Sequence, residues 1–99
     1  MMKMVSAKLQ WVRPEQGGRQ APPSGSRYST VSRFEQQRDT WRKEAWSLVI
    51  EWTEPPDASL THRVSARFLV EKAPEHLLTT GNRFELMEGE RVVATGEIL

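Results

Sequence analysis

The sequence predicts an all-β domain whose six short strands form an antiparallel closed barrel. Six segments alternate apolar with polar residues or are rich in β-branched and aromatic residues, which is typical of half-buried strands. Proline- and glycine-rich stretches separate several of these segments, and no segment shows the periodicity of a long helix. The closed form is favoured because a closed barrel has no exposed strand edge. The 99 residues are enough for one domain spanning residues 1–99.

The first half of the chain contains two predicted strands and two connections. Residues 5–11 alternate apolar and polar side chains, and residues 27–34 are rich in Tyr, Thr, Val and Phe. Between them, residues 13–26 hold three prolines and three glycines, which predicts a loop. Residues 35–44 are polar and charged, with Trp41 as their one large apolar side chain. We expect a long connection there, with room for one turn of helix.

The second half of the chain contains four predicted strands. In residues 46–52, Trp46, Leu48, Ile50 and Trp52 alternate with Ser47, Val49 and Glu51, and the two prolines that follow end this strand because proline supplies no ladder N–H. His62, Val64, Ala66, Phe68 and Val70 share one parity, with Arg63, Ser65 and Arg67 opposite, which predicts the fourth strand. Residues 72–81 form a predicted loop.

Two alternating runs at the end of the chain predict a β-hairpin. Phe84 and Leu86 begin the fifth strand, and residues 92–99 form the sixth. Between them, Gly89 supplies the positive φ that a tight hairpin loop requires. Gly96 lies inside the last strand, which predicts a bulge or the close approach of another backbone.

The four tryptophans fall into two groups. Trp11, Trp46 and Trp52 have the parity of the predicted core. Trp41 lies outside any predicted strand. Two interpretations stay open for it: a cap over the end of the barrel, or an exposed residue that contacts a partner.

The composition excludes several kinds of chemistry. The chain has no cysteine, which excludes disulfides, thiolate zinc sites and cysteine nucleophiles, and two histidines are too few for a His-rich metal site. We expect His62 at the edge of the core with one hydrogen-bond partner, and His76 on the surface. No phosphate-binding loop, nucleophile elbow or zinc-protease motif is present. The sequence therefore predicts a protein that is not an enzyme and that has no catalytic residue, metal, nucleotide or other cofactor.

The acidic residues of the hairpin do not predict acid–base catalysis. Glu85 and Glu97 are expected to point outward, where Arg83 and Arg91 provide partners across the strands.

Charge is unevenly distributed along the chain. The net charge is +1, but residues 1–45 hold nine Lys and Arg against four Asp and Glu, and residues 46–99 hold five against nine. A basic segment around the second strand is a candidate for phosphate binding and consists of Arg27, Arg33, Arg38, Arg42 and Lys43. No apolar run approaches the ~20 residues of a membrane span, and the start lacks a secretory signal. We expect a soluble cytoplasmic domain that does not bind membranes.

Three motifs resemble the third, C-terminal domain of bacterial translation elongation factor Tu. The most specific is the closing hairpin, Gly81-x-Arg83-Phe84-x-Leu86-x-Glu88-Gly89-x-Arg91-x-Val93-x-x-Gly96. The second is the loop Gly17-Gly18-Arg19-x-x-Pro22 followed by Gly25-x-Arg27, and the third is the fourth-strand segment 64–70. The order of the six predicted strands also matches, so the resemblance covers nearly the whole chain and implies a six-stranded antiparallel barrel.

The resemblance implies contact with the backbone of tRNA or another RNA. In the family, the Gly-Gly-Arg loop lies against the tRNA backbone and the hairpin tip meets the T stem. It therefore implies phosphate contacts by Arg19, Arg27 and Lys72, a contact of Glu88 with a 2′-hydroxyl, and a close approach of the Gly89 backbone. Gln20 and Ser29 depart from the family's histidine and glutamine, and residues 35–44 do not match its shorter turn. The GTPase and middle domains have no counterpart in these residues, so tRNA delivery is not implied.

Two functional hypotheses remain besides a barrel that has lost the family's contacts. The first is a non-enzymatic module that binds the RNA backbone through five residues: Arg19, Arg27, Lys72, Glu88 and Gly89. The second is a protein-interaction module that uses Trp41 and residues 35–44, with no RNA binding.

Overall fold

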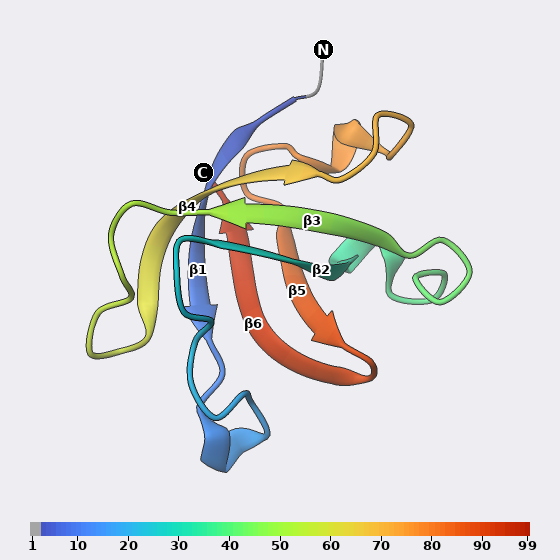
Figure 1. Ribbon diagram of the computed structural model, residues 1–99. Helices are drawn as coiled ribbons and strands as arrows, with labels where there is room; N and C mark the ends of the chain where they lie inside the picture. Colours follow the sequence, from blue (N-terminus) through green and yellow to red (C-terminus); the bar gives the residue numbers. More distant parts are fainter. Residues whose placement is uncertain (1–2) are drawn as a thin grey trace.

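Six strands surround a single interior in the computed structural model, which describes residues 3–99 (Figure 1). They are β1 (Val5–Trp11), β2 (Arg27–Phe34), β3 (Trp46–Glu51), β4 (Thr61–Phe68), β5 (Arg83–Glu88) and β6 (Arg91–Ile98). Single turns of 3-10 helix lie in the connections at η1 (Pro14–Gln16), η2 (Glu35–Gln37) and η3 (Glu75–Leu77). The sheet closes in the order β1-β4-β3-β2-β5-β6 with every neighbouring pair antiparallel, so the predicted fold class is confirmed.

The antiparallel order gives the barrel two distinct ends. At the hairpin end, β1, β3 and β5 finish and β2, β4 and β6 begin, so the β5–β6 turn lies there. At the terminal end, the described chain enters β1 and leaves β6, and Figure 1 draws the C label at this end of β6.

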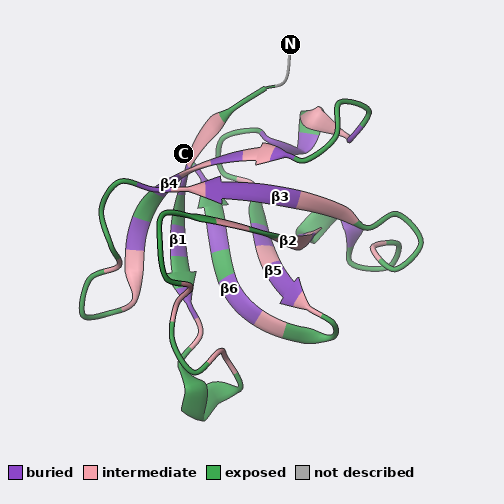
Figure 2. Ribbon diagram, viewed as in Figure 1, coloured by how far each residue is buried: buried purple, intermediate pink, exposed green. Residues whose placement is uncertain are grey.

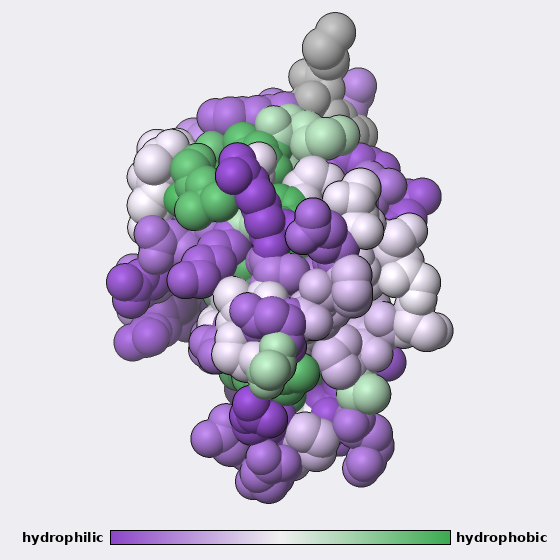
Figure 3. All heavy atoms as spheres, turned by 90° about the vertical axis from the view of Figure 1, so that its left-hand side faces the viewer, coloured by the Kyte–Doolittle hydropathy of each residue, from purple (hydrophilic) through white to green (hydrophobic). Residues whose placement is uncertain are grey.

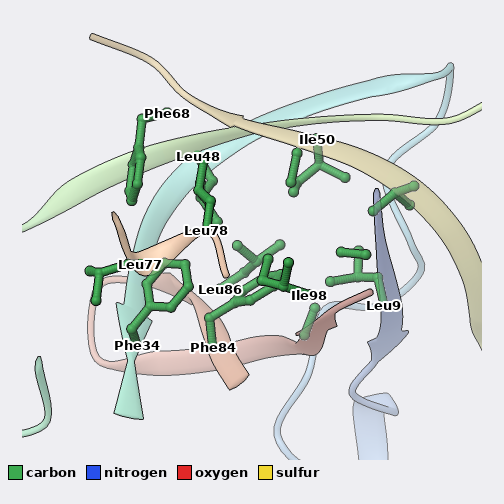
Figure 4. Close-up of a cluster of buried hydrophobic side chains, with 14 of the residues drawn as sticks. Leu9, Phe34, Leu48, Ile50, Phe68, Leu77, Leu78, Phe84, Leu86 and Ile98 are labelled. Carbon is green, nitrogen blue, oxygen red and sulfur yellow. The ribbon is translucent and has the colours of Figure 1, made fainter. Parts of the chain in front are cut away.

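Alternating side chains fill the interior. β4 shows the pattern plainly, with buried residues separated by exposed or half-buried ones (Figure 2). Phe34 lies 6.0 Å from Phe68 and 5.3 Å from Phe84 between ring centroids. Leu77 and Leu78, from η3 and the residue after it, lie among the core side chains of the strands (Figure 4). Because a barrel of this strand number is just wide enough for its own side chains, contacts with a partner must be made on the outside.

The strand bounds agree closely with the prediction, with one clear difference. The fourth strand ends at Phe68 and not at Val70, and Leu69 and Val70 have exposed fractions of 48% and 41%. Gly89 has φ +64°, which confirms the turn prediction.

The prediction for Gly96 was wrong. Gly96 pairs regularly with Leu9 of β1 and Phe84 of β5, and the irregularity of the hairpin lies between Leu86 and Met87. A Cβ at Gly96 would lie 2.3 Å from Cζ of Phe84. The group close to Gly96 is therefore the aromatic ring of Phe84 and not another backbone. Glycine suits this position because the ring occupies the space that a Cβ would fill.

His62 has two hydrogen-bond partners and not the single one predicted. The Trp11 indole N–H donates to Nε2 of His62 over 3.0 Å, so Nδ1 carries the proton and donates to the carbonyl of Glu54 over 2.9 Å. The buried ring thus ties β1 to the connection between β3 and β4. Trp11 and Trp52 are buried as predicted, and Trp46 is half-buried against the core.

Candidate nucleic-acid interface at the hairpin end

Two of the predicted RNA-binding residues contact each other. Arg19, in the loop between β1 and β2, forms an ion pair with Glu88 at the end of β5. The hydroxyl of Tyr28, at the start of β2, donates to the same carboxylate oxygen, Oε2. The Arg19 guanidinium also lies over the Tyr28 ring, 5.4 Å from its centroid. Three chain segments therefore meet at one carboxylate.

Electrostatics within this cluster favour the charged pair. The hydrogen bond from Tyr28, and then that from Arg19, hold the pKa of Glu88 below its ordinary value. The hydrogen bond to Glu88 raises the pKa of Arg19. Burial, followed by the bond to Glu88, raises the pKa of Tyr28. Glu88 is therefore ionised at neutral pH, and the Tyr28 hydroxyl stays protonated.

The cluster leaves part of Glu88 available. Its side chain has an exposed fraction of 32%, and both donors use Oε2, so none of the hydrogen bonds formed among residues 3–99 ends at Oε1. Gly89 beside it is exposed, and a Cβ added there would meet nothing within 4 Å. Open space therefore lies beside Gly89 at the tip of the hairpin.

The other predicted RNA-binding residues are dispersed. Arg27 is exposed at the start of β2, opposite Glu51 of β3, and so lies at the hairpin end. Lys72 is exposed in the connection after β4, which belongs to the terminal end. The structure thus brings Arg19, Arg27, Glu88 and Gly89 to one end of the barrel and leaves Lys72 at the other.

Trp41 is half-buried on the outer wall of the barrel and does not cap its end. The guanidinium groups of Arg33 and Arg42 lie 5.3 Å and 5.6 Å from the indole. Arg33 is paired with Glu85 of β5, and Arg42 with Glu90 of the hairpin turn. The connection between β2 and β3 therefore runs back along the outside of β5. Two guanidinium groups therefore lie over the indole, and a partner that stacks on the ring would compete with them.

Tyr28 is the residue of the interface that sequence reasoning missed. Its parity on β2 predicts a core residue, and it does pack against the core and against Trp11, with ring centroids 5.6 Å apart. Its hydroxyl contacts Glu88, which lies 60 positions later in the chain. A local sequence pattern therefore cannot indicate this contact.

No arrangement suited to metal binding occurs in the part of the chain that the structure describes: residues 3–99 contain no group of three or more His, Asp or Glu side chains able to hold an ion. Within the same residues, helical structure long and apolar enough to cross a bilayer is absent.

No protein-family model and no curated protein matches this chain. The likeness to the elongation factor domain therefore rests on the three motifs and on the order of the strands.

Proposed function

We propose that this protein is a non-enzymatic module that binds the backbone of RNA at the hairpin end of its barrel. The observation that carries the proposal is the fixed carboxylate of Glu88, which two donors hold by one oxygen while the other has no partner among residues 3–99. A carboxylate fixed in this way is suited to accept a hydrogen bond from a ribose 2′-hydroxyl, the group that distinguishes RNA from DNA.

Cations around the tip supply the phosphate contacts in this proposal. Arg27 and Arg91 are exposed, and neither forms an ion pair among residues 3–99. Phosphate contacts fix position without reading sequence, so we expect binding that is salt-dependent and largely independent of sequence. The open backbone at Gly89 lets a sugar or phosphate approach closely.

The test is a titration with a short RNA hairpin and the DNA hairpin of the same sequence, each at low and moderate salt. Uncharged and aminoacylated tRNA are titrated alongside. We expect Arg27→Gln to weaken the binding of both hairpins equally and to lower the salt slope by about 1. Glu88→Gln should weaken RNA binding and leave DNA binding unchanged or stronger, because it removes a negative charge.

The matched control is Glu90→Gln, which removes a carboxylate from the same turn, where its side chain has an exposed fraction of 73%. It should leave the preference for RNA over DNA unchanged. Absence of RNA binding at low salt, or an identical effect of Glu88→Gln on RNA and DNA, contradicts the proposal.

A further inference from the structure

The outer face of β1 and β4 carries positive charge and no negative charge. Neither strand contains an acidic residue. Their alternation turns Lys8, Arg63 and Arg67 away from the core; the first two are exposed and Arg67 is half-buried. The register places Lys8 directly opposite Arg63, and Ser6 opposite Ser65 in the next outward-facing pair. This set of five side chains is called the cation face below.

The pairing of Lys8 with Arg63 is unfavourable for the isolated protein. Side chains directly opposite each other on antiparallel strands lie about 4.5–5.5 Å apart at Cβ, and like charges at such positions destabilise a sheet. Lys8, Arg63 and Arg67 form no ion pair within the described chain, residues 3–99. Glu97 of β6 lies opposite Lys8 on its other side, but its carboxylate lies 3.6 Å from Nε of Arg83. Glu51 of β3 lies opposite Ser65 but forms no ion pair with these cations among residues 3–99, so their charged groups are available to a group outside the chain.

The remaining side chains of the cation face are suited to phosphate. Ser6 and Ser65 lie between the Lys8–Arg63 pair and Arg67, and serine hydroxyls donate to phosphate oxygens; that of Ser65 donates to the carbonyl of Glu51 over 3.4 Å and would exchange this bond for a phosphate. Arg63 and Arg67 are four residues apart, about 13 Å at about 3.3 Å per residue, so they reach different phosphates of one chain. The outward-facing positions of β1 and β4 carry no aromatic side chain, so stacking with bases does not contribute.

The surroundings leave room for a chain molecule. A hollow of about 430 Å³ adjoins Lys8 and Gln10 on one side, and another of about 490 Å³ adjoins Ser6, Arg63 and Ser65 on the other. Acidic side chains also line both hollows (Glu35, Glu85 and Glu97 in the first, Glu51 and Glu54 in the second), so a bound strand must follow the cations between them. Figure 3 looks onto the side where Figure 1 draws β4 and shows mainly hydrophilic side chains over its middle, with a hydrophobic group above them. Exposed Met4, Leu69 and Leu99 lie at the terminal ends of the adjacent strands β1, β4 and β6.

We propose that the cation face is a second nucleic-acid surface, which holds the phosphate backbone of a single strand across Lys8 and Arg63. It lies on the wall of the barrel and shares no residue with the hairpin end, so it does not depend on the function proposed above. Because its contacts are to phosphates alone, it binds RNA and DNA strands of equal length alike.

The experiment measures the binding of a single-stranded RNA, a DNA of equal length and inorganic polyphosphate by fluorescence anisotropy over a range of salt concentrations. The variant is Lys8→Gln with Arg63→Gln. Its matched control is Lys43→Gln with Arg13→Gln, which also removes one Lys and one Arg from exposed positions that line neither hollow and form no ion pair among the described residues. We expect the salt slope to fall by about 1.4 in the first variant, about 0.7 for each cation, and to stay unchanged in the control.

The outcomes separate this inference from the proposed function. If the first variant binds both strands as the wild type does, or no more weakly than the control, the cation face is not a binding surface. Binding of polyphosphate without either strand also overturns the inference. If only Arg27→Gln weakens binding, the inference is overturned and the function proposed for the hairpin end is supported. If only Lys8→Gln with Arg63→Gln weakens binding, the inference is supported and the function proposed for the hairpin end is contradicted. Thermal melting checks the fold, and the first variant should melt no lower than the wild type because it removes a repulsion.

Discussion

The strand pairs β5–β6 and β1–β4 use charge in opposite ways. In the hairpin β5–β6, Arg83 lies opposite Glu97 and Glu88 opposite Arg91, so each cation faces an acid. In β1–β4, Lys8 lies opposite Arg63 and no acid is present on either strand. In the first pair, cations and acids alternate across the strands, although Arg91 forms no ion pair among residues 3–99; the second places two cations opposite each other on the wall of the barrel.

The two strand pairs differ in how far their charged residues contribute to the stability of the fold. The hairpin is also held by the contact of Phe84 with Gly96 and by the bonds of Glu88 to Arg19 and Tyr28. The outer face of β1–β4 contains no comparable contact between charged groups. We therefore expect substitutions in the hairpin to lower stability in addition to their effect on the RNA contacts proposed for Glu88 and Arg91, and substitutions on the cation face to change binding more than stability.

The largest effect should come from Gly96→Ala, which disrupts the packing of the hairpin. The new Cβ would lie 2.3 Å from Cζ of Phe84, and the ring is confined by Phe34 with centroids 5.3 Å apart. We expect the free energy of unfolding to fall by about 1–3 kcal/mol, measured by urea denaturation. Ser65→Ala on the outside of β4 is the control and should change it by less than about 0.5 kcal/mol. Restoration of part of the loss by adding Phe84→Leu would support the steric cause.

A smaller effect is expected from Glu88→Gln, which removes the shared carboxylate at the tip. The ion pair with Arg19 is lost, while the amide oxygen still accepts from Tyr28. Because both side chains of the ion pair are about one-third exposed, water screens it, and we expect a loss of about 1 kcal/mol. Glu90→Gln should have a much smaller effect, because its pair with Arg42 is mostly exposed. Equal melting temperatures of the two variants would contradict this expectation.

The same carboxylate predicts a dependence on pH. The pKa of Glu88 lies below its ordinary value of 4.5 in the folded protein, so its contribution to stability is complete above about pH 4.5. That contribution disappears as the pH falls through the lowered pKa. The difference in unfolding free energy between wild type and Glu88→Gln should therefore shrink with acidity below pH 4.5. A difference that stays constant over this range would contradict the assignment.

The smallest effect tests the comparison most directly. Arg63→Glu gives Lys8 an opposite charge across the strands and should stabilise the protein by about 0.2–1 kcal/mol. Arg91→Glu places two acids opposite each other in β5–β6 and should destabilise it by a similar amount. Both changes should diminish at high salt, because the charges are exposed. Stabilisation by both substitutions would remove the contrast between the two strand pairs.

Local patterns in the sequence were sufficient for the strands and the turn. The alternation of residues 5–11 and the position of Gly89 predict features that depend on neighbouring residues alone, and both are confirmed. The role of Gly96 was missed because it depends on a ring across the hairpin, although the two residues are only 12 positions apart. A glycine in a strand signals a close approach without saying which group approaches.

The candidate surfaces were harder to predict than the fold. Tyr28 and Glu88, or Lys8 and Arg63, are brought together only by the register between strands distant in sequence. A basic residue in one strand gives no sign that its neighbour across the sheet is also basic. The sequence therefore predicts the residues of the hairpin end through a resemblance, and the cation face emerges only from the closed barrel.

Closure of the barrel also has a kinetic consequence. The seam between β1 and β6 pairs Ala7 with Ile98, so residues 91 positions apart must meet before the last strands can join. Contacts between such distant parts of a chain slow folding, because the search must close a large loop. A circular permutant that links residues 3 and 99 and opens the β5–β6 turn would turn this seam into a hairpin. We expect such a permutant to close the seam early and to delay the β5–β6 pairing until late in folding.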